Sequence, residues 1–226
     1  MIKQINSQSA SISNCNVSFK HCVKYLGVKI DQTLSMHDQI GEVCRVSFLF
    51  LRRISAIRSY LSVTTTARLV CAFIISRLDY CNSVLSGLSS EQLSRLQRVQ
   101  NCAARLVLRK GKRDHITPLL SQLHWLPVKY RIQYKLAVLA YHFFDETLPP
   151  YLSSVLSAYQ PSRCLRSSYE KLLKVPKFSL KSVGERSFAY SAPTNWNALP
   201  TSVRGAPTLS DFKNALKTHL FQKAFM

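Results

Sequence analysis

The arginines between residues 95 and 113 have the residue type and spacing needed to bind phosphate groups. At about 100° per residue, the arginines of the helix expected here fall within an arc of roughly 80°, away from its leucines. Three further cations continue the positive charge past the end of that helix. Cations gathered on one edge bind nucleic-acid phosphates and release their counterions. We therefore predict a phosphate-binding edge that consists of Arg95, Arg98, Arg105, Arg109, Lys110, Lys112 and Arg113.

The alternative interpretation of this run is a solvated basic face without a ligand. Such faces normally carry interspersed acids, whereas here acids stand only at the two borders of the run, as Glu91 and Asp114. A second basic cluster likewise has no acid between its first and last members, which are Arg45, Arg52, Arg53, Arg58 and Arg68. From this cluster, Arg52 and Arg53 join the predicted nucleic-acid site.

A third basic cluster includes aromatic residues. This composition suits contact with a single strand through charge and stacking. A charged loop beside core aromatics explains it equally well, so both interpretations stay open. The cluster consists of Arg163, Arg166, Lys171, Lys174, Lys177 and Lys181, with Tyr169 and Phe178.

Catalytic chemistry has little support in the sequence. Two-metal phosphoryl transfer needs at least two carboxylates that converge on Mg²⁺, and no two aspartates are adjacent here. Asp79 resembles a polymerase box but lies in a helical apolar pattern without a second aspartate, so we interpret it as a partnered helix residue. His115 and His124 are interpreted as packed side chains. We predict no catalytic residue and no metal site, and we expect no cofactor and no small-molecule substrate.

The charge of the whole chain favours a polyanionic partner. Lys and Arg number 31 against 11 Asp and Glu, which gives a formal net charge of +20. Nucleic acid is the first candidate, and an anionic membrane surface is the alternative.

Length and composition predict a folded intracellular protein. A chain of 226 residues with 46% hydrophobic content can bury a core. The seven cysteines include no Cys-x-x-Cys pair, so neither a disulfide framework nor a zinc site is implied. The N-terminus lacks the apolar segment of a secretory signal, and the longest apolar run, residues 69–75, is too short to span a bilayer. We expect a soluble protein in the nucleus or cytoplasm, and its oligomeric state stays open.

The hydrophobic pattern indicates the elements that must position these residues. Residues 10–13, 17–19 and 23–30 have the composition of strands. A period of 3.6 then predicts helices over residues 35–58, 65–86, 91–109, 128–145 and 208–224. The first and last start at capping boxes, Ser35 with Asp38 and Thr208 with Asp211, and the third begins after Ser89 and Ser90. Gly87 and Gly111 are expected to end the second and third helices, and Phe73 is expected in the core. Short helices are expected over residues 151–157 and near Arg186, a strand over 172–175, and a proline-bounded loop around Trp196.

The predicted fold class is therefore mainly α. A small N-terminal β-hairpin precedes a helical bundle, and a mixed, loop-rich C-terminal region ends in a helix. We place domain boundaries so that residues 1–31 form the β element, residues 32–160 the helical domain, and residues 161–226 a basic C-terminal region.

Eight short segments occur along the chain in a distinctive order. They are residues 24–31 (KYLGVKID), 78–83 (LDYCNS), 96–105 (LQRVQNCAAR), 123–128 (LHWLPV), 150–152 (PYL), 163–168 (RCLRSS), 196–200 (WNALP) and 212–221 (FKNALKTHLF). This ordered series resembles the reverse transcriptases of LINE-type (non-LTR) retrotransposons, of the jockey and chicken-repeat type. The resemblance covers the chain from about residue 10 to its end.

The resemblance implies a role for each part of the chain. Residues up to Asp31 look like the end of the palm with its primer-grip hairpin, centred on Tyr25, Leu26 and Gly27, and the helices that follow look like the thumb that tracks the template–primer duplex. The family's catalytic Ala-Asp-Asp turn and its upstream aspartate have no counterpart here. We therefore expect a piece of a longer polymerase, without fingers, most of the palm or an endonuclease.

Two functions follow as expectations. The first is a catalytically inactive remnant of an RNA-directed DNA polymerase that binds RNA or an RNA–DNA duplex without sequence preference, through phosphate contacts. The alternative is a helical protein-interaction or structural module, including one without a selected function, whose basic faces are inherited and idle.

Overall fold

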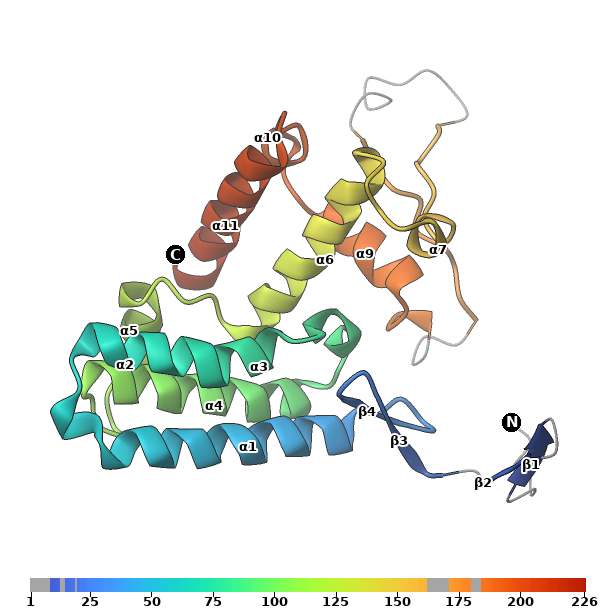
Figure 1. The fold of residues 1–226 in the computed structure, drawn as a ribbon. Helices are drawn as coiled ribbons and strands as arrows, with labels where there is room; N and C mark the ends of the chain where they lie inside the picture. Colours follow the sequence, from blue (N-terminus) through green and yellow to red (C-terminus); the bar gives the residue numbers. More distant parts are fainter. Residues whose placement is uncertain (1–8, 13–14, 19, 162–170, 180–183) are drawn as a thin grey trace.

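The structure is a computed structural model that describes residues 9–12, 15–18, 20–161, 171–179 and 184–226. The chain is mainly helical, as predicted, and its strands form two antiparallel hairpins before the first helix (Figure 1). In the first, β1 Ser9–Ile12 pairs with β2 Cys15–Ser18. In the second, β3 Cys22–Tyr25 pairs with β4 Val28–Asp31.

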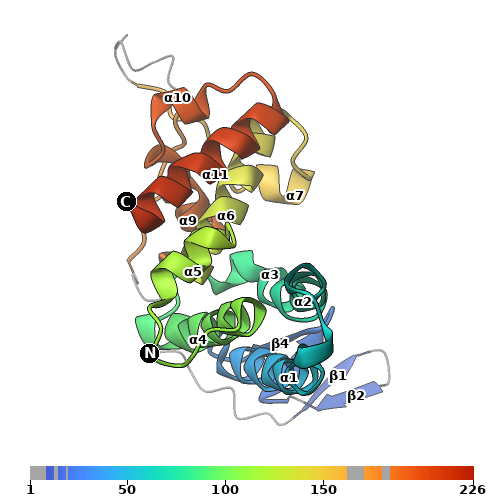
Figure 2. The same ribbon diagram turned by 90° about the vertical axis from the view of Figure 1, so that its left-hand side faces the viewer.

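The helices follow in one series. They are α1 His37–Ala56, α2 Val63–Val70, α3 Ser76–Asp79, α4 Ser90–Leu108, α5 Ile116–Gln122, α6 Val128–Phe144, α7 Pro150–Ser153, α9 Phe188–Asn197, α10 Thr201–Arg204 and α11 Leu209–Phe225. Helix α1, the α2–α3 pair and α4 lie side by side, and α6 leaves this bundle to pack between α9 and α11 (Figures 1 and 2). None of the helices in the described ranges is long and apolar enough to cross a membrane.

The predicted strand over residues 23–30 is a tight hairpin. Leu26 and Gly27 have φ angles of 45° and 83° and form its two-residue turn. A turn with positive φ at both central positions matches the twist of the flanking strands, and glycine adopts this conformation without a steric penalty. The expected β element is therefore present, and residues 26–27 are its tip.

The start of α1 differs from the predicted capping box. Met36 is the N-cap, in a left-handed conformation and without a side-chain capping bond. The carboxylate of the buried Asp31 organises this turn instead, because it accepts hydrogen bonds from the backbone N–H groups of Thr33 (3.1 Å), Ser35 (2.8 Å) and Met36 (2.8 Å). Burial acts to raise the pKa of Asp31, but these bonds, with those from the hydroxyls of Thr33 and Ser35, bring it well below its ordinary value.

The single helix predicted over residues 65–86 is divided. It continues from α2 through a π-helical segment, Cys71–Ile75, into α3, and it ends at Tyr80. Cys81, with φ of 51°, then leads into a 3₁₀ turn over Asn82–Leu85. Gly87 has the expected positive φ, of 69°. A π-helical segment inserts an extra residue into the helical repeat and so rotates the face that follows.

Helix α4 starts and ends close to its predicted limits. The Ser89 side chain caps its start by accepting from the N–H of Gln92. At its end the left-handed residue is Arg109, with φ of 53°, and the N–H of Lys110 donates to the carbonyl of Arg105 at 2.9 Å. The prediction that Gly111 ends this helix was therefore wrong, because the backbone reverses two residues earlier.

Two clusters of buried residues form the core, and α6 contributes to both. Ile132 and Leu136 pack in the first cluster, with side chains of α1, α2 and α4. Ala140 and Tyr141 pack in the second, with α9, α10 and α11. Helix α6 thereby connects the bundle to the C-terminal helices. The domain boundaries at residues 31 and 160 stay predictions.

The C-terminal region has more regular structure around Trp196 than expected. Trp196 lies in α9, fully buried, rather than in a loop, and its indole N–H donates to the carbonyl of Lys171 at 2.6 Å. The amide of Asn197 binds both backbone groups of Leu173, at 3.0 and 2.8 Å. Where a strand was expected, Leu173 forms only an isolated bridge with Ala158.

The remaining C-terminal predictions are mostly local. Thr208 caps α11 by accepting from the N–H of Asp211 at 3.1 Å, as its capping box predicts. The short helix expected over residues 151–157 is α7, and the one expected near Arg186 is α9, which starts at Phe188.

Candidate nucleic-acid interface

The C-terminal ends of α1 and α4 meet at one end of the bundle, and Arg58 joins them. Its guanidinium donates from Nε to the carbonyl of Leu106 (2.9 Å) and from Nη1 to that of Leu61 (2.7 Å), and a third bond reaches Val107 (2.8 Å). Arg58 is buried, and burial followed by the charge of Arg109 lowers its pKa. This member of the second basic cluster is therefore structural and unavailable to phosphate.

Arg95 and Arg98 lie on the side of α4 that faces α1. A Cβ atom placed on Gly41 would be 3.8 Å from Nη2 of Arg95. Burial raises the pKa of the Cys44 thiol, and the nearby charges of Arg95 and Arg98 oppose that rise. Arg95 is half-buried, whereas Arg98 is exposed. Of these two arginines, Arg98 is the one open to a ligand.

Arg105 and Arg109 bind the backbone around the end of α4. Arg105 Nη2 donates to the carbonyl of Asp114 at 3.0 Å. Arg109 Nη2 lies 3.4 Å from the carbonyl oxygens of both Arg58 and Leu61. The predicted arc of arginines exists, but two of its four members, Arg105 and Arg109, bind backbone carbonyls around the end of α4.

The segment after α4 carries exposed cations. Lys110, Lys112 and Arg113 are all exposed. Their acidic neighbour Asp114 accepts a hydrogen bond of 2.6 Å from the N–H of Gly111, and among the described residues it forms no ion pair. These three cations therefore keep their charge available at the basic end of the bundle.

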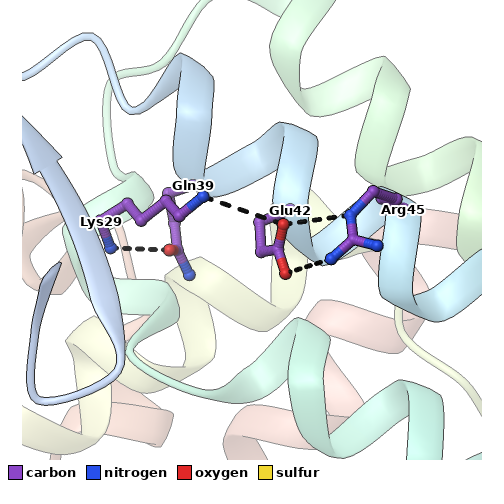
Figure 3. A network of polar contacts seen from close by, with 4 residues as sticks. All are labelled: Lys29, Gln39, Glu42 and Arg45. Carbon is purple, nitrogen blue, oxygen red and sulfur yellow. Dashed lines mark hydrogen bonds and ion pairs between the residues drawn. The ribbon is translucent and has the colours of Figure 1, made fainter. Parts of the chain in front are cut away.

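The cations of α1 are not equivalent. Arg52 and Arg53 are exposed, and Arg52 lies eleven residues, or about three turns, after Gly41 on the same side of the helix. Arg45 instead forms a two-point ion pair with Glu42, at 2.7 and 3.2 Å, and Glu42 also lies 3.8 Å from Nζ of Lys29 (Figure 3). Hydrogen bonding from Arg45 lowers the pKa of Glu42. Part of the charge of the second basic cluster is thus neutralised.

An aromatic pair on the other side of α1 was missed at the sequence level. The rings of Phe50 and Phe73 stack with centroids 4.9 Å apart and an angle of 11°. The guanidinium groups of Arg53 and Arg77 lie 5.9 and 5.2 Å from the Phe50 centroid. Phe73 is 41% exposed, so its predicted core position was wrong. The signal for the pair was a phenylalanine and an arginine at i and i+3 or i+4 in both helices.

The primer-grip-like hairpin contacts the bundle at its tip. Tyr25 and Leu26 are 65% and 75% exposed, so the turn presents apolar side chains to solvent. The hydroxyl of Tyr80 donates to the carbonyl of Leu26 at 2.6 Å, and its ring lies next to Gly27. Two segments of the family resemblance, around residues 26 and 80, therefore meet in space.

Asp79 is the acidic partner of an arginine on another helix. Both of its oxygens are engaged by the guanidinium of Arg131, with the Nε–Oδ1 bond at 2.7 Å, so the pair joins α3 to α6. Within the described ranges, no cluster of three His, Cys, Asp or Glu side chains could hold a metal ion. His115 and His124 are both exposed, which is contrary to the expectation of a packed side chain for His115, whereas the ring of His124 contacts that of Phe221.

The third basic cluster is described only in part. Lys171, Lys174 and Lys177 are exposed, and Phe178, also exposed, makes an edge contact with Tyr190. The other members lie outside the described residues, namely Arg163, Arg166, Tyr169 and Lys181.

A cleft of about 470 Å³ lies between α3, α6 and α11. Its lining includes the Asp79–Arg131 pair, Lys135 and Lys217. Neither lysine forms an ion pair with a described residue.

Comparison of the chain with known protein families, with characterised proteins and with solved structures gives no significant match.

Proposed function

We propose that this chain binds nucleic-acid duplexes, RNA or RNA–DNA, without sequence preference and without catalysing a reaction of its own. The observation that carries the proposal is the exposed charge of Lys110, Lys112 and Arg113 beside the ends of α1 and α4, which forms no ion pair with a described residue. Such cations bind phosphate oxygens and read no base. Arg52 and Arg98 extend the same surface along the two helices, whereas the guanidinium of Arg53 lies over Phe50 on the other side of α1.

The proposed origin of the chain is the thumb and adjoining regions of a LINE-type reverse transcriptase. It rests on the ordered sequence segments, and the contact between Leu26 and Tyr80, which belong to two of them, supports it. A thumb needs a basic face toward the template–primer duplex, and the described arrangement of α1 and α4 provides one.

The test is a fluorescence-anisotropy titration of a blunt RNA–DNA hybrid across a salt series. A triple variant, Lys110→Gln, Lys112→Gln and Arg113→Gln, should lower the affinity and reduce the salt slope by about three. The matched control removes three charges from other helices, as Lys129→Gln, Lys213→Gln and Lys223→Gln. Equal losses in the two variants would indicate binding to net charge alone and would reject this surface.

The second candidate, a protein-interaction module, is favoured by one observation. The Phe50–Phe73 pair, with neighbouring Leu49 at 40% exposure, forms an apolar area on the bundle. A protein partner held by this area would bind with little salt dependence, which separates it from duplex binding in the same titration.

A further inference from the structure

The cleft between α3, α6 and α11 lies apart from the proposed duplex surface and has the composition of a ligand site. Its volume of about 470 Å³ falls within the range typical of small-molecule pockets. The 3₁₀ turn at Asn82 and the π-helical segment before α3 form one side, and α11 contributes Lys217 on another. His124, from the α5–α6 connection, makes a tilted ring contact with Phe221 of α11, with centroids 5.7 Å apart, and joins these walls.

Asn82 supplies the observation that points to a ligand. The residue is only 4% exposed and lines the cleft, yet its Oδ1 has no hydrogen-bond partner among the residues that the structure describes. A buried acceptor without a donor is costly, so such groups are rare unless something binds them. Arg131, in the same cleft, donates through Nε and Nη2 to Asp79 rather than to Asn82.

The cations of the cleft indicate an anionic ligand. Lys135 lies one turn after Arg131 on α6, and Lys217 comes from α11. Both lysines are exposed and form no ion pair with a described residue. Two ammonium groups from separate helices suit a phosphate group.

The remaining walls suit a planar ring. Trp125 and Tyr134 line the cleft beside apolar Ile75. Aromatic and apolar walls with a few polar groups are typical of sites for heteroaromatic ligands. An asparagine amide pairs with the N6 and N7 edge of adenine, since its oxygen accepts from the amino group and its nitrogen donates to the ring.

We propose that this cleft binds an adenine nucleotide. The adenine amino group donates to Oδ1 of Asn82, and the phosphate lies between Lys135 and Lys217. The nucleotide is either free or an unpaired residue of a nucleic-acid strand. This inference does not rest on duplex binding at the end of the bundle.

The first test measures nucleotide binding by the full chain through quenching of tryptophan fluorescence. Trp125 lies in the cleft, and the second tryptophan, Trp196, is fully buried in the other core cluster. AMP should bind at least about tenfold more tightly than IMP, which has an oxygen in place of the amino group. Asn82→Leu should remove this difference. Equal affinity of the unaltered chain for AMP and IMP, or no binding, would overturn the proposal.

The second test examines the phosphate end with a charge-matched control. The double variant Lys135→Gln and Lys217→Gln should weaken AMP binding at least about tenfold. The control, Lys129→Gln with Lys223→Gln, removes exposed lysines from the same two helices outside the cleft and should bind AMP normally. A similar loss of AMP affinity in both double variants would reject the proposed position of the phosphate. Thermal melts verify that each variant is folded.

A third measurement uses Cys71, an exposed residue of the cleft, as a reporter. Saturating AMP should slow its alkylation by iodoacetamide, followed by mass spectrometry, and absence of protection would count against the site. A duplex with one unpaired 3′ adenosine that displaces AMP better than a blunt duplex assigns the site to a strand. AMP binding that neither duplex displaces assigns it to the free nucleotide. The variant Lys110→Gln, Lys112→Gln and Arg113→Gln should bind AMP normally, so the two proposals fail independently.

Discussion

The guanidinium of Arg58 donates a hydrogen bond of 2.8 Å from Nη2 to the carbonyl oxygen of Val107 and so ties the end of α1 to the last turn of α4. A cation at the carboxyl end of a helix also interacts favourably with the helix dipole. A buried arginine therefore stabilises the basic end of the bundle without being exposed at its surface.

Replacement of Arg58 by lysine should destabilise the chain by about 2 kcal/mol, because an ammonium group cannot reach the three carbonyls that the guanidinium fork binds. Urea unfolding measures the change. Arg52→Lys, at an exposed position of α1, is the control and should change stability by less than about 0.5 kcal/mol. A stable Arg58→Lys variant would show that the hydrogen bonds contribute little.

Leu96→Ala should destabilise the chain by roughly 2 to 5 kcal/mol, since Leu96 is buried between α4 and the rest of the first core cluster. Duplex affinity per folded molecule should stay the same. Leu93→Ala, at a half-buried position one turn earlier, should cost less. Thermal melts with anisotropy titrations measure both effects, and a loss of affinity in a fully folded Leu96→Ala variant would contradict the prediction.

Glu42→Gln should strengthen duplex binding, because it releases Arg45 and Lys29 from the only carboxylate that each contacts among the described residues. The salt slope should steepen by about one. Stability should change by less than about 1 kcal/mol, since the pair is exposed. Glu185→Gln makes the same change of net charge at an exposed position that forms no ion pair with a described residue. If this control strengthens binding equally, the effect comes from total charge.

The Asp31 carboxylate should make the free energy of unfolding depend on pH in the acidic range. Its pKa is depressed in the folded state, so its contribution is complete above the ordinary aspartate value of about 3.9 and decreases as the pH falls toward the folded pKa. Asp31→Asn should cost roughly 1 to 3 kcal/mol near neutral pH. Urea unfolding from pH 6 to pH 3 should show this difference shrinking below pH 4, whereas exposed Asp145→Asn should show little difference. A stability difference between the unaltered chain and Asp31→Asn that stays constant from pH 6 to pH 3 would refute this prediction.

The chain should give no primer extension above background with Mg²⁺ or Mn²⁺, because Asp79 is paired with Arg131 and no metal cluster exists within the described ranges. Asp79→Asn should leave that background unchanged and lower stability by about 1 kcal/mol, a small loss because the pair is partly exposed. Extension that Asp79→Asn abolishes would make Asp79 a metal ligand after all.

Local features of the sequence determined the helical class and many helix limits. The Ser89 cap of α4, the Thr208 cap of α11 and the apolar period of α6 are set by residues within one or two turns of one another, so composition and spacing suffice to predict them. The grouping of the α4 arginines on one side of the helix was also predictable, because their spacing in the sequence sets their angular positions.

Only the tertiary structure decided which of these residues are exposed and which are bound to other parts of the chain. Arg52 and Arg58 are close in sequence and identical in type, yet one is exposed and the other binds carbonyls of α4. Phe73 is exposed although the apolar pattern placed it in the core, because the buried face of this helix runs through Val70 and Ile74. Burial, pairing and the cleft at Asn82 depend on segments far apart in the chain, and a local pattern carries no information about which segment will pack against it.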